Sequence, residues 1–133
     1  MSAERRAGVD PEELARRVAR IADEKKAVDI VALDMRGLVG YTDFLVICTA
    51  RNERQAKAVH DEVHAQLKAD GRLPSHVEGV RQARWVLMDY LDCVLHVFVP
   101  AERDYYRLEN LWGEAARMEL DVAGAAPRVA SGG

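Results

Sequence analysis

The sequence predicts an α/β fold in which helices pack against a mixed β-sheet of about five strands. Residues 44–48 form a continuous apolar run, Phe-Leu-Val-Ile-Cys, which is typical of a strand covered on both faces. Residues 84–99 contain two β-rich runs separated by a short polar break, which indicates a tight antiparallel hairpin. Helical periodicity before, between and after these strands supplies the helices of the α/β class.

Composition limits the possible classes of protein. A chain of 133 residues with 49% hydrophobic residues fits one domain with a real core. The net charge of −3 argues against bulk binding to nucleic-acid phosphates, which usually requires a basic face. No apolar run reaches the ~18 residues that span a membrane, and no apolar segment follows the first residues as in a secretory signal. We therefore expect a cytoplasmic protein that does not bind membranes.

The distribution of small and polar residues divides the chain into three parts. Residues 1–9 are polar and small, and we expect them to be disordered. Residues 10–122 carry all the periodic segments and form the single domain. Residues 123–133 are rich in Gly, Ala and Ser, which predicts a flexible tail.

The first helix begins at a strong capping signal. Asp10 can accept from free backbone amides, Pro11 suits the first helical position, and Glu13 completes a capping box. Apolar residues then recur at helical spacing from Leu14 to Ile21. This pattern predicts an amphipathic helix with one buried face.

The next segments alternate between strands and a second helix. Residues 28–35 predict a strand buried mainly on one side, and residues 43–50 predict a strand buried on both sides. A helix over residues 52–70 begins with Asn52 as N-cap and Gln55 as its capping-box partner. Residues 43–50, 52–70 and 84–90 then form a crossover, which allows the two strands to be parallel.

Aromatic residues concentrate in the hairpin and in the segment after it. Both tryptophans and three of the four tyrosines lie between Arg84 and Trp112. Leu108, Leu111 and Trp112 indicate a last helix after the hairpin. Trp and Tyr are the residue types that most often anchor protein interfaces. We expect Trp85 to face a partner, Trp112 to be core, and His96 to be either.

Several motifs in this region resemble one known family. The runs W-V-L-M-D-Y-x-D-x-V-x-H-V-F-V from Trp85 and E-R-x-Y-Y-x-L-E-x-L-W from Glu102 resemble the ribosomal silencing factor family, also called Iojap-like. The resemblance extends through residues 29–34, 42–48 and 52–55, and covers roughly residues 11–118. Leu91 stands where many members carry glycine. Because leucine does not easily adopt a positive φ, we expect a different turn type there.

The resemblance implies a fold similar to nucleotidyltransferases, without a catalytic motif and without a cofactor. It implies a non-enzymatic protein that binds ribosomal protein number fourteen of the large subunit, blocks joining with the small subunit and represses translation under nutrient limitation. It also implies that homodimers occur. The candidate partner-binding residues are those of the hairpin and the following segment: Trp85, Asp89, Tyr90, Asp92, His96, Glu102, Tyr105, Tyr106, Leu108, Glu109 and Leu111.

Two alternatives give the chain a different function. Asp34 and Asp43 could form a carboxylate pair for metal-dependent nucleotidyl transfer. That chemistry also needs a phosphate-cradling Gly-Ser loop, which the sequence lacks. Arg16, Arg17 and Arg20 could instead form an RNA-binding helix face, although a solvated helix surface explains them better.

Two further patterns suggest catalysis but do not support it. His60 and His64 share a helix face as in zinc proteases, but Asp61 is shorter than the usual Glu and no third ligand follows. Cys93 and His96 could form a thiol and its base, but in a strand they point to opposite faces. We therefore predict no metal site and no catalytic residue.

Overall fold

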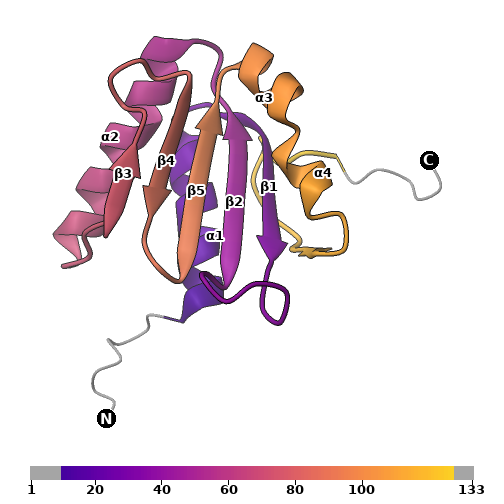
Figure 1. Ribbon diagram of the computed structural model, residues 1–133. Coiled ribbons are helices and arrows are strands. Elements are labelled where there is room, and N and C mark those ends of the chain that lie inside the picture. Colours follow the sequence, from indigo (N-terminus) through magenta and orange to yellow (C-terminus); the bar gives the residue numbers. More distant parts are fainter. Residues whose placement is uncertain (1–9, 128–133) are drawn as a thin grey trace.

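The computed structural model describes residues 10–127 and confirms the α/β class (Figure 1). Six strands form one mixed sheet in the order β3-β4-β5-β2-β1-β6, one strand more than the predicted five or so. In chain order the elements are α1 (Pro11–Glu24), β1 (Val28–Asp34), β2 (Phe44–Thr49), α2 (Glu53–Ala69), β3 (His76–Glu78), β4 (Trp85–Asp89), β5 (Cys93–Phe98), α3 (Pro100–Tyr106), α4 (Leu108–Leu111) and β6 (Ala116–Arg117). No helix among these residues is long and apolar enough to cross a membrane.

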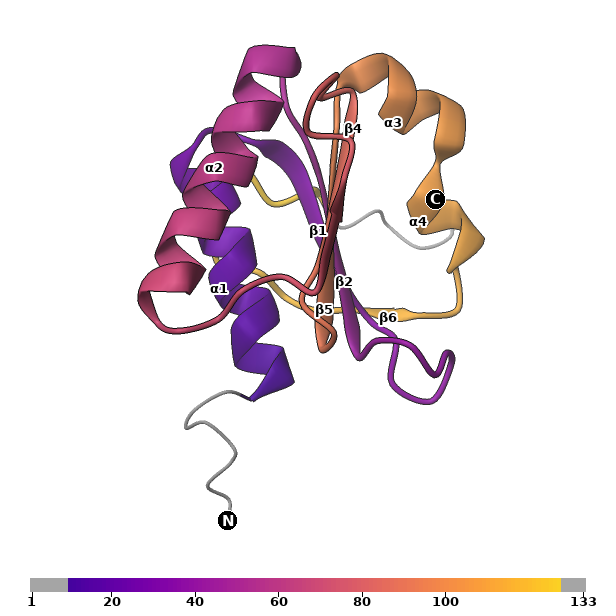
Figure 2. The ribbon, with the colours of Figure 1, turned by 60° about the vertical axis from the view of Figure 1, so that its left-hand side comes forward.

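The sheet separates two layers of helices (Figure 2). Both long helices, α1 and α2, pack on one face, here called the helical face, where the larger cluster of buried hydrophobic residues lies. The short α3 and α4 lie over the other face, here called the second face. A smaller core cluster, which includes Leu45, Ile47 and Phe98, fills the space beneath them.

The predicted caps begin both long helices. Asp10 accepts a hydrogen bond from the Glu13 backbone N–H at 3.3 Å, and Pro11 occupies the first turn of α1. Asn52 accepts from the Gln55 N–H at 2.9 Å at the start of α2. The apolar stripes that follow each cap are buried against the sheet. The local sequence thus positions both helices before any tertiary contact is considered.

The central strands are β2 and β5, which run parallel in the register Phe44↔Cys93 to Thr49↔Phe98. The predicted crossover therefore exists, but its parallel partner is wrong. β4 pairs antiparallel with β5, so β5 and not β4 lies beside β2. The reason is that the second strand of the hairpin lies on the inner side, where it is buried on both faces, whereas burial along β4 alternates. β1 also differs from the prediction, because it is buried on both faces over residues 30–33.

The turn between β4 and β5 keeps a conformation that is rare for leucine. Leu91 has φ 73°, so the expectation that leucine would change this geometry is wrong. Its N–H donates to Asp89 Oδ1 at 2.8 Å, and the Asp92 N–H donates to the Tyr90 carbonyl at 2.9 Å. These bonds hold a left-handed residue that costs roughly 1–2 kcal/mol in a non-glycine.

The C-terminal part departs most from the prediction. The expected last helix is divided into α3 and α4, because Arg107 has φ 45° and ends the first of them. Residues 124–126 were predicted to belong to a flexible tail, but they lie along β1. The Ile30 N–H donates to the Gly124 carbonyl and the Ala126 N–H donates to the Ile30 carbonyl, both at 2.9 Å. Residues 1–9 and 128–133 lie outside the described part.

The β3–β4 connection depends on a glycine that touches backbone. Gly79 has φ 83°, and an added Cβ would lie 2.0 Å from the Trp85 carbonyl oxygen. Gly71 has nearly the same conformation, φ 82°, with nothing within 4 Å of such a Cβ. A comparison of substitutions at Gly79 and Gly71 therefore separates the cost of backbone strain, which both share, from the cost of steric overlap, which only Gly79 has.

We expect Gly79→Ala to lower the free energy of unfolding more than Gly71→Ala does. Both variants acquire left-handed strain of roughly 1–2 kcal/mol, and Gly79→Ala adds an overlap that costs about 1–3 kcal/mol more. Urea unfolding of the two variants beside the wild type measures the difference. Equal losses would show that the chain relieves the overlap without cost.

Candidate functional site

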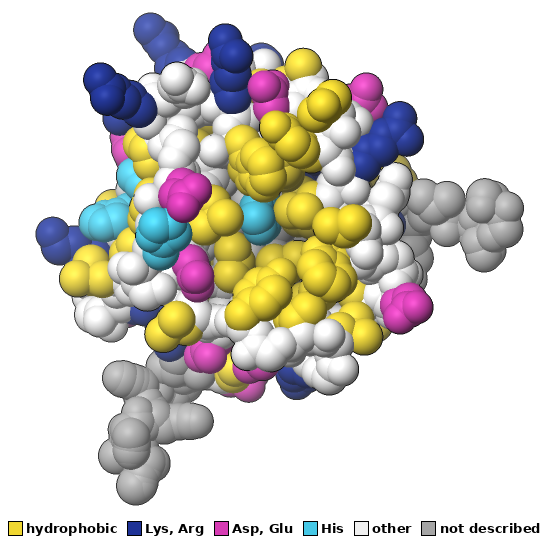
Figure 3. Space-filling model, viewed as in Figure 1, with side chains coloured by type: hydrophobic (Ala, Val, Ile, Leu, Met, Phe, Trp, Pro, Cys, Tyr) yellow, Lys and Arg dark blue, Asp and Glu magenta, His cyan; other side chains and the backbone are white. Residues whose placement is uncertain are grey.

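The second face is only partly covered by helices, because α3 and α4 do not extend over β3, β4 and β5 (Figure 1). Figure 3 shows hydrophobic side chains gathered on this face, with Lys and Arg side chains at its margins. Along β4 the burial alternates with period two. Trp85, Leu87 and Asp89 are half-buried on the second face, whereas Val86 and Met88 are buried on the helical face. The strand pleat therefore decides which hairpin side chains a partner can reach.

Five rings pack together where β4, β5 and α3 meet, and we call them the aromatic cluster: Trp85, His96, Phe98, Tyr105 and Tyr106. The Trp85 ring lies 4.9 Å from Phe98 and 4.6 Å from Tyr106, measured between centroids. Tyr105 meets Tyr106 edge to face at 4.9 Å. Tyr105 is 79% exposed and Tyr106 48% exposed, whereas Phe98 is fully buried. The cluster thus runs from the core to the surface.

A hydrogen bond inside the cluster fixes the state of its histidine. Trp85 Nε1 donates to His96 Nδ1 at 3.0 Å. An indole N–H can only donate, so Nδ1 must be the acceptor, and the ring proton of neutral His96 lies on Nε2. Burial lowers the pKa of His96 to about 4, while Asp89 raises it by a smaller amount. His96 is therefore neutral at physiological pH.

The second ring nitrogen of His96 is directed to the surface. Nε2 has no hydrogen-bond partner among the described residues. Among those residues, the Tyr90 hydroxyl is the only side-chain polar atom that is both fully buried and without a partner, so Nε2 is not fully buried. Nε2 must therefore reach solvent, although His96 as a whole is only 7% exposed. The result is one N–H donor in an apolar aromatic surface.

The acidic candidates lie at two places: Glu102 is on α3 beside the aromatic cluster, whereas Asp89 and Asp92 are at the hairpin turn, at the other end of β4 and β5. All three residues are half-buried. Leu111 is 70% exposed, and Leu108 packs half-buried against the second-face core. The side chain of Glu109, also predicted to contact a partner, lies outside the described part of the structure.

Tyr90 was predicted to contact a partner, and the structure contradicts this. It is 2% exposed and packs in the core of the helical face, one residue out of phase with Trp85. Burial raises the pKa of its hydroxyl to about 12. The period-two alternation of Trp85, Leu87 and Asp89, which are half-buried on the second face, was the signal that identifies this error.

The alternative enzyme site is not assembled. Both oxygens of Asp34 are bound by Arg36, whose Nε and Nη2 donate at 2.9 and 2.7 Å. This hydrogen bonding keeps the pKa of Asp34 below its usual value. The Asp43 backbone carbonyl accepts from the Met35 N–H as part of the strand connection. The described residues contain no group of three or more acidic, His or Cys side chains that could hold a metal ion.

The other predicted patterns have structural roles. His60 and His64 stack 5.9 Å apart on α2, and His60 Nδ1 lies 2.8 Å from Asp61 Oδ1. Cys48 and Cys93 are buried free thiols, and burial raises the pKa of each to about 12. These thiols are therefore protonated and inert at neutral pH.

Two of the three arginines in the candidate RNA-binding face of α1 make contacts within the chain. Arg16 donates to the Glu119 carbonyl at 2.7 Å and to Glu12 at 3.2 Å. Arg17 pairs with Asp70 at the end of α2. Arg20 is exposed. The contacts of Arg16 and Arg17 remove the reason to assign these two side chains to RNA.

Fold and site together define an α/β domain that presents a partly open sheet face with an aromatic cluster on it. The family model for the ribosomal silencing factor during starvation matches residues 9–131. The chain is 43% identical over 103 residues to ribosomal silencing factor RsfS of Bacillus subtilis, covering 77% of this chain and 87% of that protein. It is 42% identical over 110 residues to RsfS of Halalkalibacterium halodurans, covering 83% and 94%.

Solved structures agree with these sequence matches. A crystal structure of a protein from Chromobacterium violaceum superposes with a TM-score of 0.77 at 32% identity, over 90% of this chain and 98% of that one. A crystal structure from Bacillus halodurans gives a TM-score of 0.73 at 40% identity, over 82% and 99%. The chain belongs to the ribosomal silencing factor family, RsfS or Iojap. It is a non-enzymatic factor that silences ribosomes during starvation.

The buried His96 predicts a specific pH dependence. The pKa of His96 in the folded chain, about 4, lies below the ordinary value of 6.5. Between these two pH values the histidine is protonated in the unfolded chain and neutral in the folded chain. The stabilisation is present above the unfolded pKa and is lost as the pH falls from about 6.5 towards 4, by up to about 3 kcal/mol. Urea unfolding at several pH values in this window, on the wild type and on His96→Gln, measures it.

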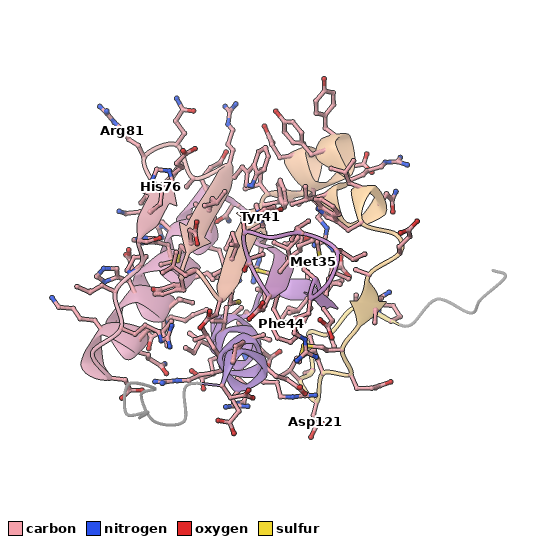
Figure 4. All side chains as sticks on the ribbon, turned by 60° about the horizontal axis from the view of Figure 1, so that its bottom comes forward. Met35, Tyr41, Phe44, His76, Arg81 and Asp121 are labelled. Carbon is pink, nitrogen blue, oxygen red and sulfur yellow. The ribbon has the colours of Figure 1, made fainter. Side chains whose placement is uncertain are left out.

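His76→Gln is the control, because His76 is exposed on β3 of the same face (Figure 4). It should keep the pH dependence of the wild type, whereas His96→Gln should flatten it. A wild-type slope in His96→Gln would mean that another group causes the loss in acid.

Proposed function

We propose that this chain binds the large ribosomal subunit through ribosomal protein number fourteen and blocks joining with the small subunit. The second face is the docking surface, and the aromatic cluster is its centre. Translation falls under nutrient limitation because a subunit that carries the factor has no room for its partner. The cytoplasm is the expected compartment, since ribosomes act there.

The exposed end of the aromatic cluster carries this proposal. Tyr105 and Tyr106 expose 79% and 48% of their surface, and Trp85 is half-buried beside them. Exposed rings on a packed base lose little conformational entropy on binding, and Trp and Tyr lead among interface hot spots. Phe98 and the sheet hold these rings from below, so the surface is formed before the partner arrives.

The acidic groups at the margins of the second face favour a basic protein as partner. Asp89, Asp92 and Glu102 border the face, and the chain carries a net charge of −3. Acidic groups at the rim speed the approach of a basic ribosomal protein more than they add affinity. His96 adds a fixed N–H donor, which selects a partner that offers an acceptor at that point.

Sedimentation tests the proposal directly. The protein should pellet with free large subunits and not with small subunits. Added to purified subunits, it should reduce the amount that joins. Equal binding to both subunits, or undisturbed joining in the presence of bound factor, would contradict the proposal.

Tyr105→Ala is the sharpest variant, because the side chain is almost fully exposed and contacts only Tyr106 among the rings. We expect it to weaken binding to the large subunit by about 2 kcal/mol, roughly thirtyfold, as hot-spot aromatics do. Folding stability should change by no more than about 0.5 kcal/mol. Binding titrations and urea unfolding give the two values.

Tyr41→Ala is the matched control. Tyr41 is 58% exposed, but it lies on the β1–β2 connection, which is at the opposite end of the sheet from α3 (Figure 1). It should bind like the wild type. If Tyr41→Ala loses affinity and Tyr105→Ala does not, the docking surface lies at the other end of the sheet.

A further inference from the structure

We propose that a second surface of this chain binds the phosphate backbone of ribosomal RNA beside the protein docking site. This surface, here called the basic end, lies where α2 begins and where the β3–β4 connection enters β4. The inference rests on the proposed docking of the second face on the large subunit. The basic end consists of five exposed side chains: Arg51, Arg54, Lys57, Arg81 and Arg84.

One ion pair brings the two segments of the basic end together. Arg84 Nε lies 3.7 Å from Glu53 Oε2, which joins the β3–β4 connection to the first turn of α2. Arg51 and Arg54 flank Glu53 in the chain, and Arg81 lies three residues before Arg84. Figure 4 places Arg81 at the outer edge of the molecule, pointing into solvent. The five cations therefore occupy one end of the molecule, although they come from two parts of the chain.

The local charge is opposite to that of the whole chain. The basic end gathers five cations with Glu53, in a protein whose net charge is −3. Such a concentration of like charge costs stability through self-repulsion, which an anionic partner relieves. The N-terminus of α2 adds a partial positive charge to the same place.

Four of the five cations of the basic end make no side-chain hydrogen bond or ion pair within the described part of the chain, whereas Arg84 pairs with Glu53. Arg16, Arg17 and Arg36 each pair with an acid of the same chain. By contrast, Arg51, Arg54, Lys57 and Arg81 have no side-chain hydrogen bond or ion pair with any described residue. Their side chains are available to a partner without the loss of an internal contact.

RNA is the partner that this chemistry fits best. Four of the five cations are arginines, whose planar guanidinium binds two phosphate oxygens at once. Arg84 directly precedes Trp85, so the basic end borders the aromatic cluster. A protein seated on a ribosomal protein through that cluster would bring the basic end to the adjoining RNA. The acidic balance of the remaining surface explains why such a contact adds to docking but does not give bulk RNA binding.

The experiment compares two double variants that remove the same charge. Arg51→Gln with Arg81→Gln removes two cations of the basic end. Arg20→Gln with Lys68→Gln removes two exposed cations elsewhere, on α1 and in the last turn of α2. The affinity of each for purified large subunits is measured over a range of KCl concentrations at constant magnesium. Thermal melting confirms that both are folded.

We expect the basic-end variant to bind less tightly at low salt. Its slope of log affinity against log salt should fall by about two, one for each lost phosphate contact. The control variant should keep the wild-type slope. Wild-type affinity and slope in the basic-end variant would overturn the inference.

Binding to isolated ribosomal protein number fourteen separates this inference from the proposed function. The basic-end variant should bind that protein as the wild type does, since no RNA is present. An equal loss on the isolated protein would show that the cations contact protein, which contradicts the RNA assignment. If Tyr105→Ala keeps full affinity for the subunit while the basic-end variant loses it, the docking proposal fails and the RNA contact stands.

Discussion

β2 and β5 lie side by side and parallel at the centre of the sheet, and every residue of both strands is buried. Parallel neighbours cannot be joined by a tight turn, so the chain between them must leave the sheet and return. That path carries α2 across one face and then adds β3 and β4 at the outer edge. The two long helices therefore share one face. The other face keeps its outer strands free of long helices, and this is the surface that the proposed function uses.

Burial on both faces also makes the second face stiff. Phe98 lies in the core and supports the Trp85 ring directly, and Trp85 in turn orients His96 through its N–H. A surface group that depends on a buried strand moves little on its own. The rings lose their conformational entropy when the protein folds, so binding a partner costs little further side-chain entropy.

The sequence allowed the elements to be predicted but not all of their neighbours. Caps such as Asp10 and Asn52 act within four residues, so local chemistry is enough to place them. Which hairpin strand lies beside β2 depends on the whole sheet, although the nearly continuous apolar run of residues 93–98 was a local signal that the second strand is covered on both faces. The φ of 73° at Leu91 was unexpected, because two local hydrogen bonds outweigh the intrinsic preference of leucine. Tyr90 was an avoidable error, since counting alternate residues from Trp85 assigns it to the helical face.

The two edge strands of the sheet affect how readily molecules of this chain associate with one another. β3 at one edge has three residues and β6 at the other has two. Unpaired strand edges are templates on which a second chain can add its own strand, and short edges give such addition little to build on. Beside β6, residues 124–126 already use the backbone groups of Ile30. A protein with an exposed apolar face can thus stay free of fibrous self-assembly, because its sheet cannot readily be lengthened sideways.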